Sequence, residues 1–224
     1  MNTEQARFNM IEQQIRPWNV LEQDVLDLLM VVKREDFVPA AYKGLAFMDT
    51  EIPLPGGENM LQPKVEARVL QAAAVKKHEH VLEIGTGSGY MAALLAHKAR
   101  QVTTVEIDPA IRSQAQQNLS AYGIANVDVQ LGNGAQGWPQ GQGQAGAAGE
   151  YDVIIISGSL PFLPESILAQ VKVGGRIVAF VGQPPAMSAQ VITRTGDRVY
   201  DTVKLFETVV KPLHAATQPS HFTF

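Results

Sequence analysis

The spacing of hydrophobic residues changes near residue 76 and divides the chain into two regions. Before this point the apolar residues follow helical spacing, with an interruption at 16–19, where Pro17 and Asn19 break the pattern. We expect a helix in two pieces over 3–32, then loops rich in proline and glycine, and a further helix over 64–75. The pattern therefore predicts an N-terminal helical region over 1–75.

From residue 80 onward, short apolar runs alternate with helical patterns, which is typical of a parallel sheet with crossover helices. The run at 152–157 is apolar throughout its middle and fits a strand buried on both faces. Gly174 and Gly175 are expected to form the turn before the last strand of this series. The expected strands are 80–84, 101–106, 127–131, 152–157 and 176–181, then terminal strands at 189–194 and 199–210; the expected helices are 89–97, 109–122 and 163–171.

These elements predict an α/β fold with a Rossmann-like, mostly parallel sheet, helices on both faces and an N-terminal helical extension. A length of 224 residues suits a single domain, in which 76–224 form the α/β core. Residues 140–149 contain only Gln, Gly and Ala, and we expect them to form a surface loop.

The composition narrows the possible functions. A formal charge of −4 without a basic cluster argues against a nucleic-acid partner. The chain has no cysteine and its five histidines show no ligand spacing, so we expect no disulfide and no metal site. The N-terminus lacks a signal pattern, and no apolar run approaches the roughly 18 residues of a membrane span. We therefore expect a cytoplasmic protein without a membrane partner, of undetermined oligomeric state.

A glycine-rich turn is the strongest chemical signal in the chain. Residues 81–89, Val-Leu-Glu-Ile-Gly-Thr-Gly-Ser-Gly, form an apolar run that leads into Gly85, Gly87 and Gly89. Such a turn between a strand and a helix lets the backbone approach a ligand closely. Glu106 ends the next apolar run, 21 positions after Gly85, where its carboxylate can accept hydrogen bonds from a ribose diol. The two features together indicate a cofactor that contains a nucleoside.

The spacing of the glycines distinguishes between cofactors. The dinucleotide fingerprint G-x-G-x-x-G would require a third glycine at residue 90, which is Tyr90. The chain instead has Glu83 followed by glycines at alternate positions, the spacing of S-adenosyl-L-methionine (SAM) methyltransferases. An oxidoreductase that uses NAD is disfavoured by Tyr90 and by the lack of proton-relay residues.

Over most of residues 7–210 the chain resembles the protein-L-isoaspartate (D-aspartate) O-methyltransferase family. Residues 32–39, Val-Lys-Arg-Glu-Asp-Phe-Val-Pro, are similar to the family's V-P-R-E-x-F-V-P, and residues 46–57 are similar to its A-Y-x-D-x-x-L-P-I-G segment. Residues 132–139 match G-D-G-x-x-G-W, and 152–156 and 173–182 match the later strands.

This resemblance implies a Rossmann-like, SAM-dependent methyltransferase that acts on L-isoaspartyl and D-aspartyl residues of damaged proteins. Methylation of the free carboxylate is followed by cyclisation to a succinimide, which partly reopens as normal aspartate, so the family repairs proteins. A carboxylate with a pKa near 4 is ionised at pH 7 and needs no general base, so positioning can supply most of the catalysis. The candidate cofactor-binding residues are Glu83, Gly85, Thr86, Gly87, Ser88, Gly89, Glu106, Ile107, Gly132, Asn133, Gly134 and Ser157.

The chain departs from the family in its substrate-facing segment. The family has G-Q-T-I-S-x-P where residues 57–63 read Gly-Glu-Asn-Met-Leu-Gln-Pro, so Asn59 replaces a threonine and Leu61 replaces a serine. The serine is thought to bind near the incoming carboxylate, and loss of one such donor can cost about 10²–10³ in rate. Either the Asn59 amide supplies a donor, or the chain is a divergent paralogue: a methyltransferase with another acceptor, or a SAM-binding protein without repair activity. Asn59 and Leu61 are the candidate catalytic positions.

Three further differences concern the cofactor side and the tail. Asn133 stands where the family has an aspartate that accepts from the adenine amino group, and its carbonyl oxygen can still accept. Phe180 replaces a proline. The tail from Thr208 to Phe224 does not follow the usual ending, and the sequence leaves open whether it packs over the sheet edge or over the site.

Overall fold

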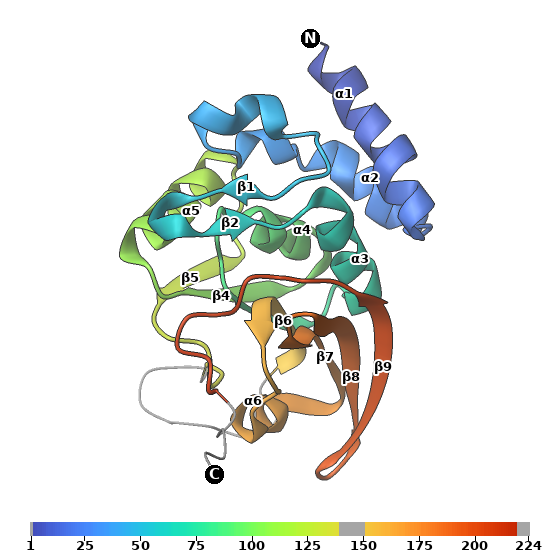
Figure 1. Cartoon of the computed structure of the whole chain (residues 1–224), viewed down its shortest axis with the longest axis vertical. Coiled ribbons are helices and arrows are strands. Elements are labelled where there is room, and N and C mark those ends of the chain that lie inside the picture. The colour runs from blue at the N-terminus through green and yellow to red at the C-terminus, as the bar shows by residue number, and fades with distance from the viewer. Residues whose placement is uncertain (1, 139–150, 219–224) are drawn as a thin grey trace.

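A seven-stranded sheet with the order β5-β4-β3-β6-β7-β8-β9 forms the centre of the fold (Figure 1). The computed structural model describes residues 2–138 and 151–218, so the loop predicted at 140–149 lies outside the described residues. The strands from β5 to β7 are parallel, and β8 and β9 extend the sheet in antiparallel orientation. The strands are β3 (His80–Ile84), β4 (Gln101–Glu106), β5 (Val127–Leu131), β6 (Tyr151–Leu160), β7 (Val171–Gln183), β8 (Ala186–Gly196) and β9 (Val199–Glu207).

The helices begin and end close to the positions that the sequence predicts. The first helical segment passes through a π-helical turn and ends at Asn19, whose φ of 59° breaks the helix as expected. Asp108 caps α5, because its Oδ1 accepts hydrogen bonds from the backbone N–H groups of Ala110 (2.7 Å) and Ile111 (3.0 Å). The helices are α1 (Thr3–Met10), α2 (Gln23–Val31), α3 (Pro63–Ala73), α4 (Tyr90–Lys98), α5 (Pro109–Ala121) and α6 (Glu165–Gln170).

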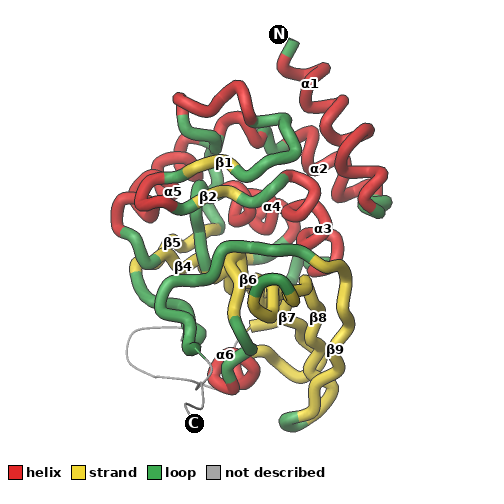
Figure 2. Tube along the Cα trace, viewed as in Figure 1, coloured by secondary structure: helices red, strands yellow, loops and turns green. Residues whose placement is uncertain are grey.

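Alternate residues of the central strands contribute to two hydrophobic clusters, one on each face of the sheet. Val153 and Ile155 of β6 pack with the N-terminal helices, α3 and α4. Ile154 and Ile156 pack on the opposite face with Ile167 of α6. The run 152–157 is therefore buried on both faces, which confirms the expected α/β fold with helices on both sides of the sheet. Figure 2 shows most of the helices in the half of the view that contains the N-terminus, above most of the seven-stranded sheet.

A small hairpin, β1 (Ile52–Pro53) with β2 (Asn59–Met60), was not predicted from the sequence. Its strands have two residues each and are too short to show an alternating pattern. Ile52 pairs with Met60, and the backbone N–H of Leu54 donates to the carbonyl of Glu58 at 2.7 Å. The turn uses Gly56 with a φ of 66°, a conformation that favours glycine. The hairpin lies within the region that the sequence predicts to be loop, and it carries Asn59.

The structure corrects the expected start of β7. Gly174 and Gly175 lie inside this strand and not in a turn before it. Pairing with β6 passes from Tyr151↔Val171 to Val153↔Arg176, so the extra residues form a bulge, and Gly174 has a φ of 82°. Other boundaries also differ: β6 extends to residue 160, α6 covers only 165–170, and β9 ends at residue 207.

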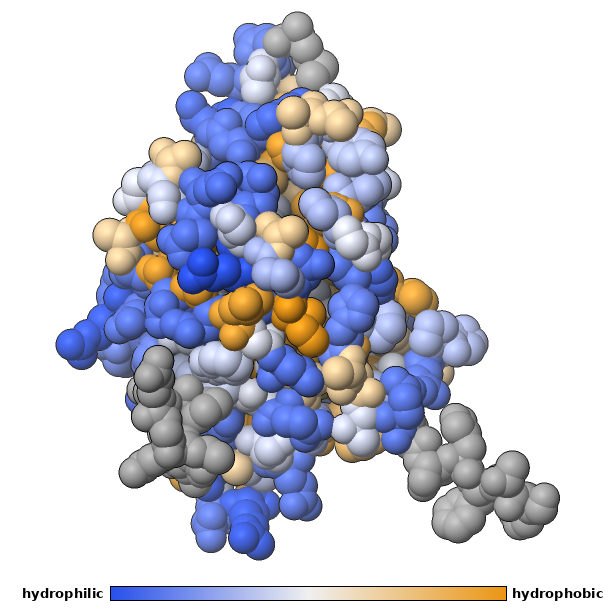
Figure 3. Space-filling view, turned by 90° about the vertical axis from the view of Figure 1, so that its left-hand side faces the viewer, coloured by the Kyte–Doolittle hydropathy of each residue, from blue (hydrophilic) through white to orange (hydrophobic). Residues whose placement is uncertain are grey.

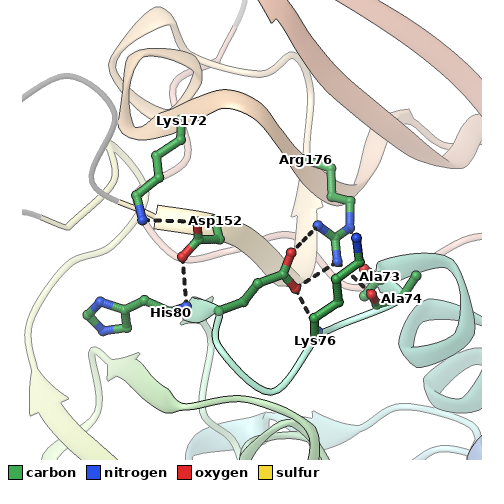
Figure 4. Close-up of polar contacts among 8 residues, drawn as sticks. Ala73, Ala74, Lys76, His80, Asp152, Lys172 and Arg176 are labelled. Atoms are coloured by element: carbon green, nitrogen blue, oxygen red, sulfur yellow. Dashed lines mark hydrogen bonds and ion pairs between the residues drawn. The ribbon is translucent and has the colours of Figure 1, made fainter.

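A polar network joins the amino ends of β3 and β6 to β7 (Figure 4). The guanidinium of Arg176 donates to both carboxylate oxygens of Glu79, at 2.8 and 2.9 Å, and to the carbonyls of Ala73 and Ala74. Beside it, the Asp152 carboxylate accepts from the backbone N–H of His80 at 2.8 Å. This network fixes the end of α3 against the sheet.

In the part of the chain that the structure describes, no helix is long and apolar enough to cross a membrane. The face shown in Figure 3 is mostly hydrophilic, with a small hydrophobic group near its centre.

The Arg176 network predicts that the free energy of unfolding depends on pH. Burial raises the pKa of Glu79, but the hydrogen bonds from Arg176 and from the Lys76 N–H outweigh it and hold this pKa below the usual 4.5. The resulting stability is present above about pH 4.5 and is lost as the pH falls through the folded-state pKa. We expect Arg176→Met to lower the free energy of unfolding by about 2–3 kcal/mol at pH 7 and by less once Glu79 is protonated. A series of urea unfolding measurements from pH 7 down to the lowest pH at which the wild type remains folded follows both values through the titration of Glu79.

Lys172→Met is the matched control, because Lys172 forms a more exposed ion pair with Asp152 (2.9 Å) in the same network. We expect it to cost less than about 1 kcal/mol. An Arg176→Met variant that unfolds like the wild type at pH 7 would contradict the assignment.

Candidate active site

The carboxyl ends of the parallel strands form one wall of a pocket of about 360 Å³. The chain passes from β3 to β4 and β5 on one side of β3, and then to β6 and β7 on its other side. The strand order therefore reverses at β3, and the carboxyl end of this strand is a topological switch point. Ligands of open α/β sheets bind at such points, outside the carboxyl ends of the strands. A smaller cavity of about 40 Å³ lies next to the pocket, and Gly85, Gly87 and Ser157 line both.

The glycine turn after β3 forms the centre of the pocket wall. Gly85, Gly87 and Gly89 all have positive φ, at 93°, 54° and 85°, so the turn depends on glycine. Gly85 and Gly87 line the pocket. Gly89 lines neither cavity: it precedes α4, and a Cβ there would lie 3.3 Å from the Leu119 side chain of α5.

Glu106 at the end of β4 connects the glycine turn to the next loop. Its carboxylate accepts hydrogen bonds from the backbone N–H of Gly87 at 3.0 Å and from those of Ile107 (2.9 Å) and Asp108 (3.1 Å). A carboxylate has about four acceptor positions, so one remains for a ligand. Backbone donors thus hold Glu106 beside the glycine turn, where the sequence predicts a carboxylate.

Glu83 lies deeper and faces the smaller cavity. It is fully buried and accepts hydrogen bonds from the hydroxyl of Thr104 at 2.6 Å and from that of Ser157 at 3.2 Å. Burial raises the pKa of Glu83 to about 8, because the two hydroxyl donors only partly offset the loss of solvation. Glu83 is therefore harder to ionise than an exposed glutamate.

The loop after β5 forms the wall beside Ile107. A Cβ at Gly132 would lie 2.4 Å from the Trp138 ring, and one at Gly134 would lie 2.7 Å from Ile84, so neither position has room for a side chain. Asn133 turns its carbonyl oxygen toward the N–H of Ala135, which donates to it at 2.9 Å. Ile107 is 39% exposed and offers an apolar surface to the pocket.

The hairpin residues complete the opposite wall. Asn59 and Leu61 line both cavities, and the Asn59 amide donates a long hydrogen bond of 3.3 Å to the carbonyl of Met60. The Leu61 side chain is buried with the N-terminal hydrophobic cluster and offers no hydrogen bond. Its carbonyl accepts from Arg34 at 2.7 Å.

The buried side chain of Arg34 holds the wall that carries Asn59 and Leu61 in place. It is 1% exposed and donates to the Glu66 carboxylate at 3.1 Å and to the Ala46 carbonyl at 3.0 Å, in addition to Leu61. Burial raises the pKa of Glu66, and Arg34 opposes that shift. One buried guanidinium therefore connects the segments before and after the hairpin to α3.

Comparison with known proteins identifies the family. Residues 5–215 match the family described as Protein-L-isoaspartate(D-aspartate) O-methyltransferase (PCMT). Protein-L-isoaspartate O-methyltransferase 1 of Rhodopseudomonas palustris is 38% identical over 88% of this chain and 77% of its own length. A second enzyme of that species, protein-L-isoaspartate O-methyltransferase, is 36% identical over 92% of both chains. The chain belongs to the PCMT family.

Solved structures agree with this membership at the level of the fold. A Plasmodium falciparum protein assigned as a protein-L-isoaspartate O-methyltransferase, in complex with S-adenosyl-L-homocysteine, aligns with a TM-score of 0.79. The two are 17% identical over 92% of this chain and 97% of that one. A further protein-L-isoaspartate O-methyltransferase aligns with a TM-score of 0.74 at 23% identity, over 95% of this chain and 66% of its own.

The structure brings nearly all of the site residues predicted for this PCMT family member to the two cavities; Gly89 is the exception. The larger pocket is lined by Asn59, Leu61, Gly85, Gly87, Glu106, Ile107, Gly132, Asn133, Gly134 and Ser157, and the smaller cavity adds Glu83, Thr86 and Ser88. Among the residues placed by the structure, no group of three or more His, Cys, Asp or Glu side chains is arranged to hold a metal ion.

Sequence reasoning missed several residues of the site. The segment 210–214 crosses the pocket, so this part of the tail packs over the site. It carries no motif, and only its failure to follow the family ending singled it out. Glu58 and Asp108 also line the pocket, and both stand directly beside predicted site residues. Tyr90 and Glu66 line the smaller cavity.

The Arg34 contacts predict a strong effect of one substitution. Arg34→Met leaves the Glu66 carboxylate buried without a partner, and we expect the free energy of unfolding to fall by about 3–5 kcal/mol. Adding Glu66→Leu should recover part of this loss, since it removes the uncompensated charge. Urea unfolding of the single and double variants measures the effect.

Arg16→Met serves as the control, because Arg16 pairs with Glu12 on an exposed helix surface at 2.9 Å. It should cost less than about 0.5 kcal/mol. If the double variant is no more stable than Arg34→Met, the ion pair is not the source of the effect.

Proposed function

We propose that this protein is a SAM-dependent carboxyl methyltransferase that methylates L-isoaspartyl and D-aspartyl residues of damaged proteins, as a step in protein repair. The observation that carries the proposal is the pocket at the carboxyl ends of β3 and β4, where Glu106 faces the glycine turn, in a chain that matches the PCMT family over 5–215. The expected partners are proteins or peptides that contain isoaspartyl residues.

The residues present fit the proposed cofactor. A volume of about 360 Å³ lies within the usual range of small-molecule sites, about 300–1,000 Å³. In this proposal Glu106 accepts from a ribose hydroxyl through its remaining acceptor position, and Ile107 and the Gly132–Gly134 loop enclose the adenine. The region at Gly85 and Ser157, which line both cavities, and the polar groups around Glu83 then receive the methionine part. When bound, SAM supplies a methyl group activated by its positive sulfur.

The contribution of the protein to this chemistry is mainly positional. The acceptor carboxylate is ionised at pH 7, so no side chain has to remove a proton. Leu61, which is buried, and the glycine turn line the pocket, and alignment of the acceptor with the methyl group can supply several orders of magnitude in rate. We propose that residues 1–75 form the acceptor side, with Asn59 as its nearest amide donor, and that 76–224 form the cofactor side of one domain.

Methyl transfer from labelled SAM to an isoaspartyl peptide tests the function directly. The same peptide with a normal aspartyl residue is the matched control. We expect label only in the isoaspartyl peptide, as a base-labile ester. If S-adenosyl-L-homocysteine binds but neither peptide is labelled, the repair function is wrong and the acceptor has to be sought elsewhere.

Glu106→Gln tests the assignment of the cofactor side. The amide keeps the size of the side chain but loses the charge and one acceptor oxygen. We expect S-adenosyl-L-homocysteine to bind about 10- to 100-fold more weakly in calorimetry, the range for loss of a hydrogen bond to a charged group.

Glu12→Gln, on the surface of the N-terminal helix, is the control and should not change the affinity. Thermal unfolding without ligand shows whether the Glu106 variant remains folded. Unchanged affinity in a folded Glu106→Gln variant would exclude Glu106 from the cofactor site.

A further inference from the structure

The charges around the pocket pose a problem for an anionic acceptor. Three carboxylate side chains line it, those of Glu58, Glu106 and Asp108. Lys211 is the only lysine or arginine among the described residues that line the pocket. A carboxylate that enters is repelled by the three acidic groups, so a nearby cation has a large influence on its binding.

Lys211 is held in place by its backbone. Ser159 near the end of β6 donates its N–H to the Lys211 carbonyl at 2.9 Å and accepts from the N–H of Leu213 at 2.9 Å. The Ser159 hydroxyl also donates to the carbonyl of Val210 at 2.8 Å. In Figure 1 this segment runs from the end of β9 past β6 to the side of β4. The pairing fixes the root of the Lys211 side chain at the carboxyl end of a core strand.

The Lys211 ammonium already binds a carboxylate in this structure. Its Nζ lies 2.8 Å from Oε1 of Glu58 and also donates to the carbonyl of Gly57. His214 Nε2 lies 2.8 Å from the same Glu58 oxygen. Burial raises the pKa of Glu58, but the bonds from Lys211 and His214 outweigh it and hold this pKa below its usual value. Glu58 is therefore ionised at pH 7 and forms an ion pair with the Lys211 ammonium.

Lys211 belongs to residues 76–224, but its pairing with Glu58 brings its ammonium to the acceptor side of the pocket. Glu58 directly precedes Asn59, and Lys211, Glu58, Asn59 and Leu61 line the same pocket. The Leu61 side chain offers no hydrogen-bond donor there, and the Asn59 amide makes only a long bond to the neighbouring carbonyl. The Lys211 ammonium is the strongest donor on this side of the pocket.

We propose that Lys211 is the residue that binds the free carboxylate of the acceptor, which takes the place that the Glu58 carboxylate holds in this structure. The identity of that acceptor as an isoaspartyl residue rests on the proposed function. Exchange of one carboxylate for another preserves the charge around Lys211, so the acceptor does not have to compensate for a newly exposed ammonium. The methyl ester that the proposed reaction produces is neutral and loses this attraction, which favours release of the product.

Peptide binding to protein saturated with S-adenosyl-L-homocysteine tests the proposal without turnover. The probes are an isoaspartyl peptide and the same peptide with that carboxyl group converted to a carboxamide. We expect Lys211→Gln to weaken binding of the carboxylate peptide about tenfold, the effect of losing one charge-assisted hydrogen bond, and to leave the carboxamide peptide nearly unchanged. Lys211→Arg should retain the preference for the carboxylate.

Glu58→Gln gives a prediction of opposite sign. It removes the competing carboxylate, so the carboxylate peptide should bind several-fold more tightly than it does to the wild type. Lys172→Gln is the matched control, because Lys172 also forms an ion pair with a carboxylate at 2.9 Å, but at the far end of the sheet. It should change the binding of neither peptide.

Two results would overturn the proposal. If Lys211→Gln and Glu58→Gln weaken both peptides equally, the pair only clamps the tail to the hairpin. If the wild type binds both peptides equally, the pocket has no carboxylate receptor. The methyl-transfer assay separates this from the proposed function: labelling by the wild type with an unchanged KM in Lys211→Gln would remove only the role of Lys211, whereas no labelling by the wild type would remove the repair function.

Discussion

The buried ion pair between Arg34 and Glu66 is the interaction on which the geometry of the candidate site depends most. A buried pair by itself adds little stability, because desolvation offsets much of the attraction between the charges. Arg34, however, also donates to the carbonyls of Ala46 and Leu61, so the same guanidinium fixes both ends of the segment that contains the β1–β2 hairpin. The wall that carries Asn59 and Leu61 is thus positioned by a residue that touches neither of the two cavities.

Two sequence signals were sufficient to predict the core of the fold and the proximity of the glycine turn to Glu106. The strand-and-helix alternation after residue 80 reflects local burial, which is why 152–157 could be recognised as a strand buried on both faces. The glycine turn and Glu106 could be placed because parallel strands bring their carboxyl ends to one edge of the sheet. The hydrogen bond from the Gly87 N–H to the Glu106 carboxylate shows that the glycine turn and Glu106 lie next to each other, as expected. The family resemblance supplied the acceptor chemistry, which neither signal contains.

The features that the sequence did not reveal depend on contacts between distant residues or on backbone conformation. The hairpin strands around Ile52 and Asn59 are too short to show a periodicity, and they are fixed by Arg34 and by their own pairing. Gly174 could be recognised as a break, but the strand continues through it because a positive φ allows a bulge as readily as a turn. The approach of Lys211 to Glu58 spans most of the chain, and no spacing rule connects two residues so far apart.

The span of the pocket residues has a consequence for the order of folding. Strands β7, β8 and β9 are joined by short turns, so their pairing closes small loops at low entropic cost. The pocket, by contrast, combines residues from Gly56 to His214, and its contacts close some of the longest loops in the chain. We therefore expect strands β7, β8 and β9 to pair early in folding and the pocket to form late. A ligand that requires the whole pocket then binds only the fully folded chain, so a rise in its concentration stabilises the tail and the hairpin in their native positions.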